Sequence, residues 1–138
     1  RITKISWIPF DLGKHMYTII ERWMLSTNVN HFGFDGMQIN EHAQYTEYLK
    51  GGFYDWHMDT SAEMSAMPTV RKISMTLLLS DPKDFTGGDL EILTEGKQPK
   101  LKRGQAIFFA SFIRHRVKPV LKGNRKSLVM WFGGPPLK

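Results

Sequence analysis

The sequence predicts a mainly β domain, built as a β-sandwich or barrel with one helix on one face. Apolar residues recur at helical spacing in one stretch, over about residues 12–26. After residue 44, short apolar or alternating runs are separated by turn residues. The chain has 138 residues, which is enough for one domain with a proper core and too few for two.

The N-terminal part contains the predicted helix. Residues 5–10 form a short apolar stretch typical of a strand or a lead-in, and Asp11 is the candidate N-cap of the helix. The helix carries an apolar stripe that we expect to face the core, made of Leu12, Met16, Ile19, Ile20, Trp23 and Met24. Residues 29–43 are typical of a loop with at most one strand.

The remainder of the chain is predicted to consist of short strands and turns. We expect strands over residues 45–49, 53–59, 73–79, 90–93, 105–110, 115–120 and 126–132. Glycine pairs at 51–52 and 87–88 mark turns, and residues 96–104 form a basic turn region. Residues 60–70, rich in small side chains, are predicted to form a lid on the substrate side of the site.

The composition is that of a soluble globular protein, with 41% apolar and 12% aromatic residues. No apolar run approaches the roughly 20 residues of a membrane span, and no stretch is typical of a signal peptide. The chain has no cysteine, which excludes disulfides, thiolate metal sites and a cysteine nucleophile. The lack of cysteine also favours a cytoplasmic location.

The net charge is +6, and many of the basic residues lie between residues 97 and 126. A solvated basic surface is the simplest interpretation of this excess. An anionic substrate or a nucleic-acid partner are the alternatives. No stretch resembles a nucleic-acid module with interleaved exposed aromatic residues, so a nucleic-acid partner is not expected.

Residues 53–59 contain the side chains that point to chemistry. Strand alternation places an apolar set on one face, which we expect to pack against a second layer: Tyr54, Trp56 and Met58. The other face carries Phe53, Asp55, His57 and Asp59. Burying an imidazole and a carboxylate without partners costs a few kcal/mol each, so a divalent metal is the candidate partner. A His-x-Asp triplet alone is weak evidence and needs a third ligand.

His115 is the candidate third ligand, because it opens a predicted strand with its side chain on the inner face. Two histidines and one carboxylate, with three coordination positions left open, suit non-haem Fe(II). Asp55 is a candidate hydrogen-bond partner for a ligand histidine, with an exposed strand-end carboxylate as the alternative. The remaining histidines are expected to be solvated or structural: His15, His31 and His42.

Arg125 lies at the start of the last predicted strand, where period two places Arg125, Ser127, Val129 and Trp131 on one face. A guanidinium presented inward beside a metal site favours a carboxylate held in bidentate geometry. The alternatives are an internal acidic partner for Arg125 or an arginine exposed at a strand end.

One pattern runs through the chain from residue 48 onward: Tyr48…His57-x-Asp59…Gly87-Gly88…Gly104…His115-x-Val117-x-Pro119-Val120…Arg125-x-Ser127. It resembles the Fe(II)/2-oxoglutarate-dependent dioxygenases, specifically the prolyl-4-hydroxylase-like and PKHD-type hydroxylases. The resemblance covers about residues 44–134. It implies a double-stranded β-helix (jelly-roll, cupin-like) fold in a single domain over 1–138, with a helix and lead-in at 1–43 and the core at 44–134.

The resemblance also implies the site and its cofactors. His57, Asp59 and His115 would be the catalytic residues that hold Fe(II), and Arg125 would bind the distal carboxylate of 2-oxoglutarate. Tyr48, Ser127 and Trp131 would be the other cosubstrate-binding residues, with core packing as the alternative for Trp131. The implied reaction is O2-driven C–H hydroxylation with release of succinate and CO2, with peptidyl proline as the leading substrate and ascorbate as a candidate further cofactor.

The chain departs from the family pattern at two positions. Leu78 stands where some members have a second tyrosine, so we expect help in cosubstrate binding from Ser74 or Thr76. Position 131 is tryptophan and not the second arginine of the nucleic-acid-demethylating branch, which argues against base repair.

Several alternatives to a peptide hydroxylase stay open. They are an oxygenase acting on a small molecule, a non-enzymatic binding module, and a cupin-like metal hydrolase or isomerase. The expected partners are 2-oxoglutarate and a protein, peptide or small-molecule substrate, without a membrane.

Overall fold

The computed structural model describes residues 1–60 and 69–136, and the predicted mainly β fold with one α-helix is confirmed. The larger sheet has five antiparallel strands in the order β1 (Lys4–Ile8), β2 (Ala43–Tyr48), β10 (Arg125–Gly134), β4 (Val70–Leu78) and β7 (Ala106–Ala110). A three-stranded sheet consists of β3 (Tyr54–His57), β8 (His115–Val117) and β6 (Leu90–Ile92). A further pair is β5 (Phe85–Gly87) with β9 (Val120–Gly123).

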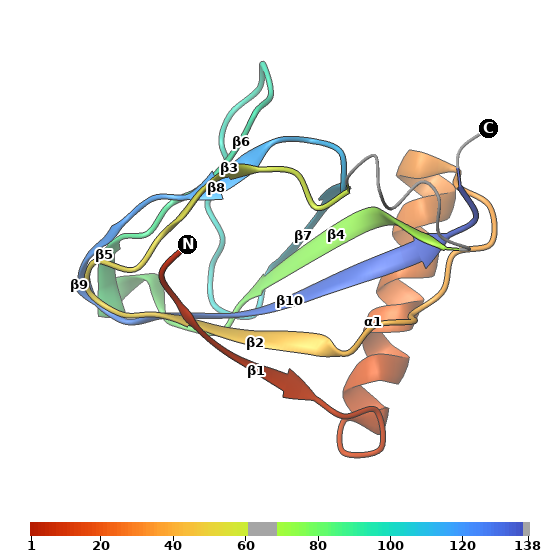
Figure 1. Ribbon diagram of the computed structural model, residues 1–138, viewed down its shortest axis with the longest axis horizontal. Coiled ribbons are helices and arrows are strands. Elements are labelled where there is room, and N and C mark those ends of the chain that lie inside the picture. Colours follow the sequence, from red (N-terminus) through yellow and green to blue (C-terminus); the bar gives the residue numbers. More distant parts are fainter. Residues whose placement is uncertain (61–68, 137–138) are drawn as a thin grey trace.

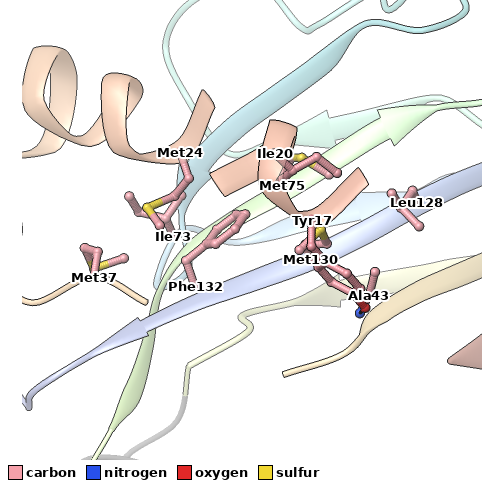
Figure 2. Close-up of a cluster of buried hydrophobic side chains, with 10 residues drawn as sticks. All are labelled: Tyr17, Ile20, Met24, Met37, Ala43, Ile73, Met75, Leu128, Met130 and Phe132. Atoms are coloured by element: carbon pink, nitrogen blue, oxygen red, sulfur yellow. Dashed lines mark hydrogen bonds between the residues drawn. The ribbon is translucent and has the colours of Figure 1, made fainter. Parts of the chain in front are cut away.

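The helix α1 (Lys14–Thr27) covers one face of the larger sheet, while the smaller sheet lies away from α1 (Figure 1). The two buried clusters reflect this layering. The first joins α1 to the outer face of the sheet, and Figure 2 shows it: Tyr17, Ile20, Met24, Met37, Ala43, Ile73, Met75, Leu128, Met130 and Phe132. The second lies between the sheets: Tyr48, Leu90, Ile92, Phe109, Val117 and Val120.

The predicted helix exists, but its start and its buried face differ from the expectation. The helix begins at Lys14 after Gly13, which makes no side-chain cap hydrogen bond, so Asp11 is not the N-cap. Leu12 is 79% exposed and Trp23 is 41% exposed. Tyr17 is buried instead, because Tyr17, Ile20 and Met24 follow the three-and-four spacing of the face that meets the sheet.

Tyr17 also fastens the helix to the sheet through its hydroxyl group. This hydroxyl donates to the carbonyl oxygen of Ile8 at 2.5 Å and accepts the backbone N–H of Ala43 at 2.6 Å. Ile8 ends β1 and Ala43 begins β2, and these two residues pair with each other. One side chain of α1 therefore sets the position of the helix against two strands.

The inner face of the larger sheet is polar, and this determines where the site lies. Side chains alternate between faces along a strand, so the strands that give α1 an apolar surface turn their other residues inward. The inward set from β2, β4 and β10 includes Gln44, Thr46, Tyr48, Ser74, Thr76, Arg125 and Ser127. Polar groups thus face the smaller sheet across the interior.

The structure differs most from the expected strands at residues 115–120 and 85–87. The single strand expected over 115–120 is two strands, β8 and β9, because Pro119 lies between them and has no N–H to donate to a ladder. Residues 85–87, expected to be turn, form β5 after a short 3-10 helix at Pro82–Asp84. A one-turn π-helix follows α1 at Asn28–Phe32.

The predicted lid over residues 60–70 falls mostly on residues 61–68, which lie outside the described part. Among residues 1–60 and 69–136, no helix has the length and apolar character needed to cross a membrane.

Candidate metal and cosubstrate site

The structure brings His57, Asp59 and His115 together. β3 and β8 pair in antiparallel fashion with His57 directly opposite His115, and Asp59 follows two residues after His57. The Oδ1 atom of Asp59 lies 3.4 Å from the Nε2 atom of each histidine. One candidate ligand atom from each residue lies within 4.8 Å of the other two, a spacing that suits one shared metal ion.

Backbone carbonyl groups fix the orientation of both imidazole rings. The Nδ1 atom of His57 lies 2.7 Å from the carbonyl oxygen of Asp55, and that of His115 lies 3.0 Å from the carbonyl oxygen of Ile113. A carbonyl oxygen only accepts, so each Nδ1 carries the proton and each neutral ring turns its Nε2 lone pair toward Asp59. Three acceptors that converge without a donor need a cation, and the residues therefore fit a divalent metal.

The second carboxylate oxygen of Asp59 is held on the side of the larger sheet. The hydroxyl of Ser74 donates to Oδ2 of Asp59 at 2.6 Å and lies 2.9 Å from the hydroxyl of Ser111. The backbone N–H of Asp59 donates to the carbonyl oxygen of Ser111 at 2.9 Å. These contacts leave Oδ1 directed at the two histidines.

The electrostatics favour an ionised carboxylate at this point. Burial by itself would raise the pKa of Asp59, but the Ser74 hydroxyl and the two imidazoles, which donate to Asp59 when they are protonated, outweigh it and hold that pKa well below its usual range. For His115, burial alone would lower the pKa, yet the hydrogen bond and charge of Asp59 raise it overall. Both shifts reflect the same preference for positive charge beside Asp59.

The expected alternation along residues 53–59 does not hold throughout, because the pairing of β3 with β8 shifts register between Tyr54 and His57. Tyr54 does not lie on the opposite face: its ring stacks on that of His57 with centroids 3.5 Å apart. Trp56 and Met58, expected to pack against a second layer, are 39% and 48% exposed. The Asp55 side chain is also exposed, and its backbone carbonyl takes the predicted role beside His57.

A cavity of about 370 Å³ adjoins the three candidate ligands. Tyr48, Thr76 and Trp131 line it, together with Val129 from the inner face of β10. The Trp131 indole Nε1 is buried and has no hydrogen-bond partner among the described residues. Burial raises the pKa of Tyr48, so its hydroxyl stays a neutral donor. The cavity therefore offers uncharged hydrogen-bond donors beside the metal site.

Arg71 forms one wall of this cavity and was not singled out in the sequence. Its guanidinium lies over the Trp131 ring at 4.0 Å from the centroid. It also makes two hydrogen bonds to the Glu41 carboxylate, at 2.8 and 2.6 Å. No strand pattern indicated this contact, because Glu41 and Arg71 lie 30 residues apart.

Arg125 is buried and forms no ion pair with an acidic residue of the described ranges, although the charge of Asp89 acts on it. It is 3% exposed, and its only side-chain hydrogen bond within the described ranges is to the Ser127 hydroxyl at 3.4 Å. Tyr48 is its neighbour across the β2–β10 ladder, with the guanidinium 5.9 Å from the ring centroid. The alternatives of an internal ion pair and of an exposed strand end are therefore not seen. Burial lowers the pKa of Arg125, as expected for a charge removed from water.

The residues expected to help hold the cosubstrate lie in different places. Leu78 is buried opposite Ser127 in the β4–β10 ladder. Thr76 lines the cavity, whereas Ser74 donates to Asp59 at the candidate metal site. Sequence analysis missed Ser111, because the pairing of β4 with β7 that brings it to Ser74 is not visible from local pattern.

Ser74→Ala should weaken divalent-metal binding by about 10–100-fold while the protein stays folded, because it frees Oδ2 of Asp59 to rotate. Anaerobic calorimetric titration with Fe(II) or Co(II) measures this. Ser127→Ala is the matched control, since Ser127 is equally buried but contacts Arg125. Equal metal affinity in Ser74→Ala and in the unmodified chain would show that Ser74 does not position Asp59.

Two histidines and a carboxylate that converge beside a cavity could hold one metal ion and leave coordination positions open. The chain belongs to the 2OG-Fe(II) oxygenase superfamily, whose family model matches residues 43–133. The resemblance seen in the sequence is thereby confirmed. Membership implies Fe(II), 2-oxoglutarate and O2 as the cofactor and cosubstrates.

Relatives of this chain include PKHD-type hydroxylases. That of Colwellia psychrerythraea is 31% identical over 128 residues, which cover 80% of this chain and 57% of the relative. That of Teredinibacter turnerae is 40% identical over 90 residues, covering 61% of this chain and 39% of the relative. The chain therefore spans less than two thirds of the length of these relatives.

Solved structures share the jelly-roll fold. The viral collagen prolyl hydroxylase of Paramecium bursaria Chlorella virus-1, solved with 2OG, has a TM-score of 0.81 at 20% identity, covering 97% of this chain and 80% of that one. A prolyl hydroxylase of Trichoplax adhaerens, in complex with a hypoxia inducible factor peptide fragment, has a TM-score of 0.75 at 21% identity, with 94% and 62% covered.

Proposed function

We propose that residues 1–138 form one Fe(II)- and 2-oxoglutarate-dependent hydroxylase domain. One observation carries this proposal: a buried arginine that forms no ion pair with any residue the structure describes lies in the same interior as a converged His-Asp-His site. An isolated buried charge is unfavourable by several kcal/mol. A dicarboxylate that reaches from the metal to Arg125 would satisfy the charge and the metal together.

The roles of the residues follow from their positions. His57, Asp59 and His115 would hold Fe(II), while Arg125 and Ser127 would bind the distal carboxylate of 2-oxoglutarate. Tyr48 and Trp131 would contact the cosubstrate from the cavity that they line. The bound iron would supply the O2 chemistry that converts 2-oxoglutarate to succinate and CO2 and hydroxylates a C–H bond of the substrate.

Peptidyl proline is the proposed substrate class. The support is the names of the relatives and structural neighbours, which include PKHD-type and prolyl hydroxylases, one of them in complex with a peptide. The cavity is large enough for a small side chain, at about 370 Å³. An oxygenase acting on a small molecule is the alternative within the same family. A cytoplasmic location stays a prediction.

Anaerobic titration of the apo-protein with Fe(II), then with 2-oxoglutarate, tests the proposal. We expect a weak visible charge-transfer band on addition of 2-oxoglutarate, because the cosubstrate chelates the iron. Metal binding without a band would instead favour a cupin-like hydrolase or isomerase. A failure to bind metal would favour a non-enzymatic binding module.

A further inference from the structure

A second cavity, of about 400 Å³, lies next to Arg125. None of the three candidate metal ligands lines it, and Leu90 is the residue that it shares with the first cavity. Arg125 lines this second cavity, while its neighbour Tyr48 lines the first. Arg125 therefore stands at the boundary between the two spaces.

The walls of the second cavity combine cations with apolar surface. Arg125 and Lys100 contribute two positive charges and Asp89 contributes one negative charge, so the charged side chains carry a net charge of +1 (2 − 1). Apolar side chains, Leu78, Phe85 and Leu101, supply much of the remaining wall. Such a lining suits a carboxylate that is attached to methylene groups.

Two glycines allow the backbone to pack closely against Arg125 at the wall of this cavity. Gly87 and Gly88 line the cavity and have φ angles of +75° and +65°, which other residues rarely adopt. A Cβ atom on Gly88 would lie 3.1 Å from Cδ of Arg125, and one on Gly87 would lie 2.5 Å from the carbonyl oxygen of Pro119. The turn therefore approaches Arg125 closely without placing a side chain in the cavity.

We propose that the cosubstrate site continues past Arg125 into this second cavity and accepts 2-oxo dicarboxylates longer than 2-oxoglutarate. The inference rests on the proposed function. If the site ended at Arg125, the extra methylene of a longer diacid would have to displace packed side chains. The longer diacid would then bind about 10–200-fold more weakly than 2-oxoglutarate. Here the lengthened chain meets open space, and its carboxylate stays near Arg125 with Lys100 on a further wall.

2-Oxoadipate, which is one methylene longer than 2-oxoglutarate, is the probe. Both diacids are titrated anaerobically into the Fe(II)-loaded full chain, and the visible charge-transfer band reports binding. We expect the dissociation constant of 2-oxoadipate to lie within about tenfold of that of 2-oxoglutarate, because the added methylene enters space that is already open.

Filling the second cavity should selectively weaken the binding of the longer diacid. Leu101→Trp and, independently, Thr86→Trp place bulk in the second cavity from two different segments. Each should raise the dissociation constant of 2-oxoadipate by more than about tenfold and leave that of 2-oxoglutarate nearly unchanged. Leu93→Trp is the control, because Leu93 is 62% exposed and lines neither cavity.

The outcomes separate the two proposals. A band with 2-oxoglutarate but none with 2-oxoadipate at about 100-fold higher concentration would overturn the extended site and leave the proposed function standing. The extended site would also be overturned if the folded Leu101→Trp and Thr86→Trp variants bound both diacids more weakly to the same degree. Absence of a band with either diacid in the unmodified chain would overturn the proposed function itself.

Discussion

Asp59→Ala should abolish succinate formation, because it removes the anionic ligand of the His57–Asp59–His115 candidate metal site. Removing an outer partner of a metal ligand typically costs 10–100-fold in affinity. Loss of a charged ligand should therefore weaken Fe(II) binding by more than about 100-fold. Anaerobic Fe(II) titration measures the affinity, and succinate release measures turnover.

Asp55→Ala is the matched control for this variant. Asp55 is also a carboxylate near His57, but its side chain is exposed and its backbone carbonyl, which the substitution keeps, holds Nδ1 of His57. Fe(II) affinity and turnover should stay close to those of the unmodified chain. Turnover by Asp59→Ala at the unmodified rate would refute the assignment of the metal site.

The apo-protein offers a second test of Asp59 that needs no metal. The hydrogen bond and charge of Asp59 raise the pKa of His115 against the effect of burial. In Asp59→Ala, only the backbone hydrogen bond to Ile113 would still oppose burial, so the pKa of His115 should fall from its raised value. NMR titration of the His115 ring measures the shift. A pKa that does not move would show that Asp59 does not contact His115 in solution.

The candidate metal ligands and Arg125 could be singled out from the sequence, because each was identified from its own strand and its own side-chain chemistry. Strand alternation indicates which side chains share a face, and ligand chemistry indicates which of them a metal would accept. His57, Asp59 and His115 lie together in the structure as expected. Arg125 points inward at the predicted strand start and is buried.

The residues that support this site could not be found in the same way. Ser74 and Ser111 meet through the pairing of β4 with β7, and pairing between distant strands is not encoded in local periodicity. Tyr54 was assigned to the wrong face because a register shift breaks strict alternation between Tyr54 and His57. Strand pattern therefore located the candidate metal ligands, but not the side chains that orient them.

Substitution of Arg125 should weaken cosubstrate binding without destabilising the apo-protein. Arg125→Gln should weaken 2-oxoglutarate binding by about 30-fold or more, since truncating one partner of a buried charge pair costs about 2–5 kcal/mol. Fe(II) affinity should not change, because Arg125 touches none of the three candidate ligands. The free energy of unfolding of the apo-protein should stay equal or rise, since the substitution removes a buried charge that forms no ion pair with the residues described here.

The stability measurement distinguishes a binding role for Arg125 from a structural one. If Arg125 stabilised the fold itself, its substitution would destabilise the apo-protein and lower the midpoint of urea unfolding. If Arg125 binds the diacid, its substitution matters only when the diacid is present. 2-Oxoglutarate should therefore stabilise the Fe(II)-loaded unmodified chain much more than it stabilises the Fe(II)-loaded Arg125→Gln variant. Arg103→Gln is the control, because Arg103 lies on the surface with its side chain 61% exposed. The opposite result would be an Arg125→Gln variant that is destabilised in the apo state and still binds 2-oxoglutarate as tightly as the unmodified chain. This result would show that another residue binds the distal carboxylate.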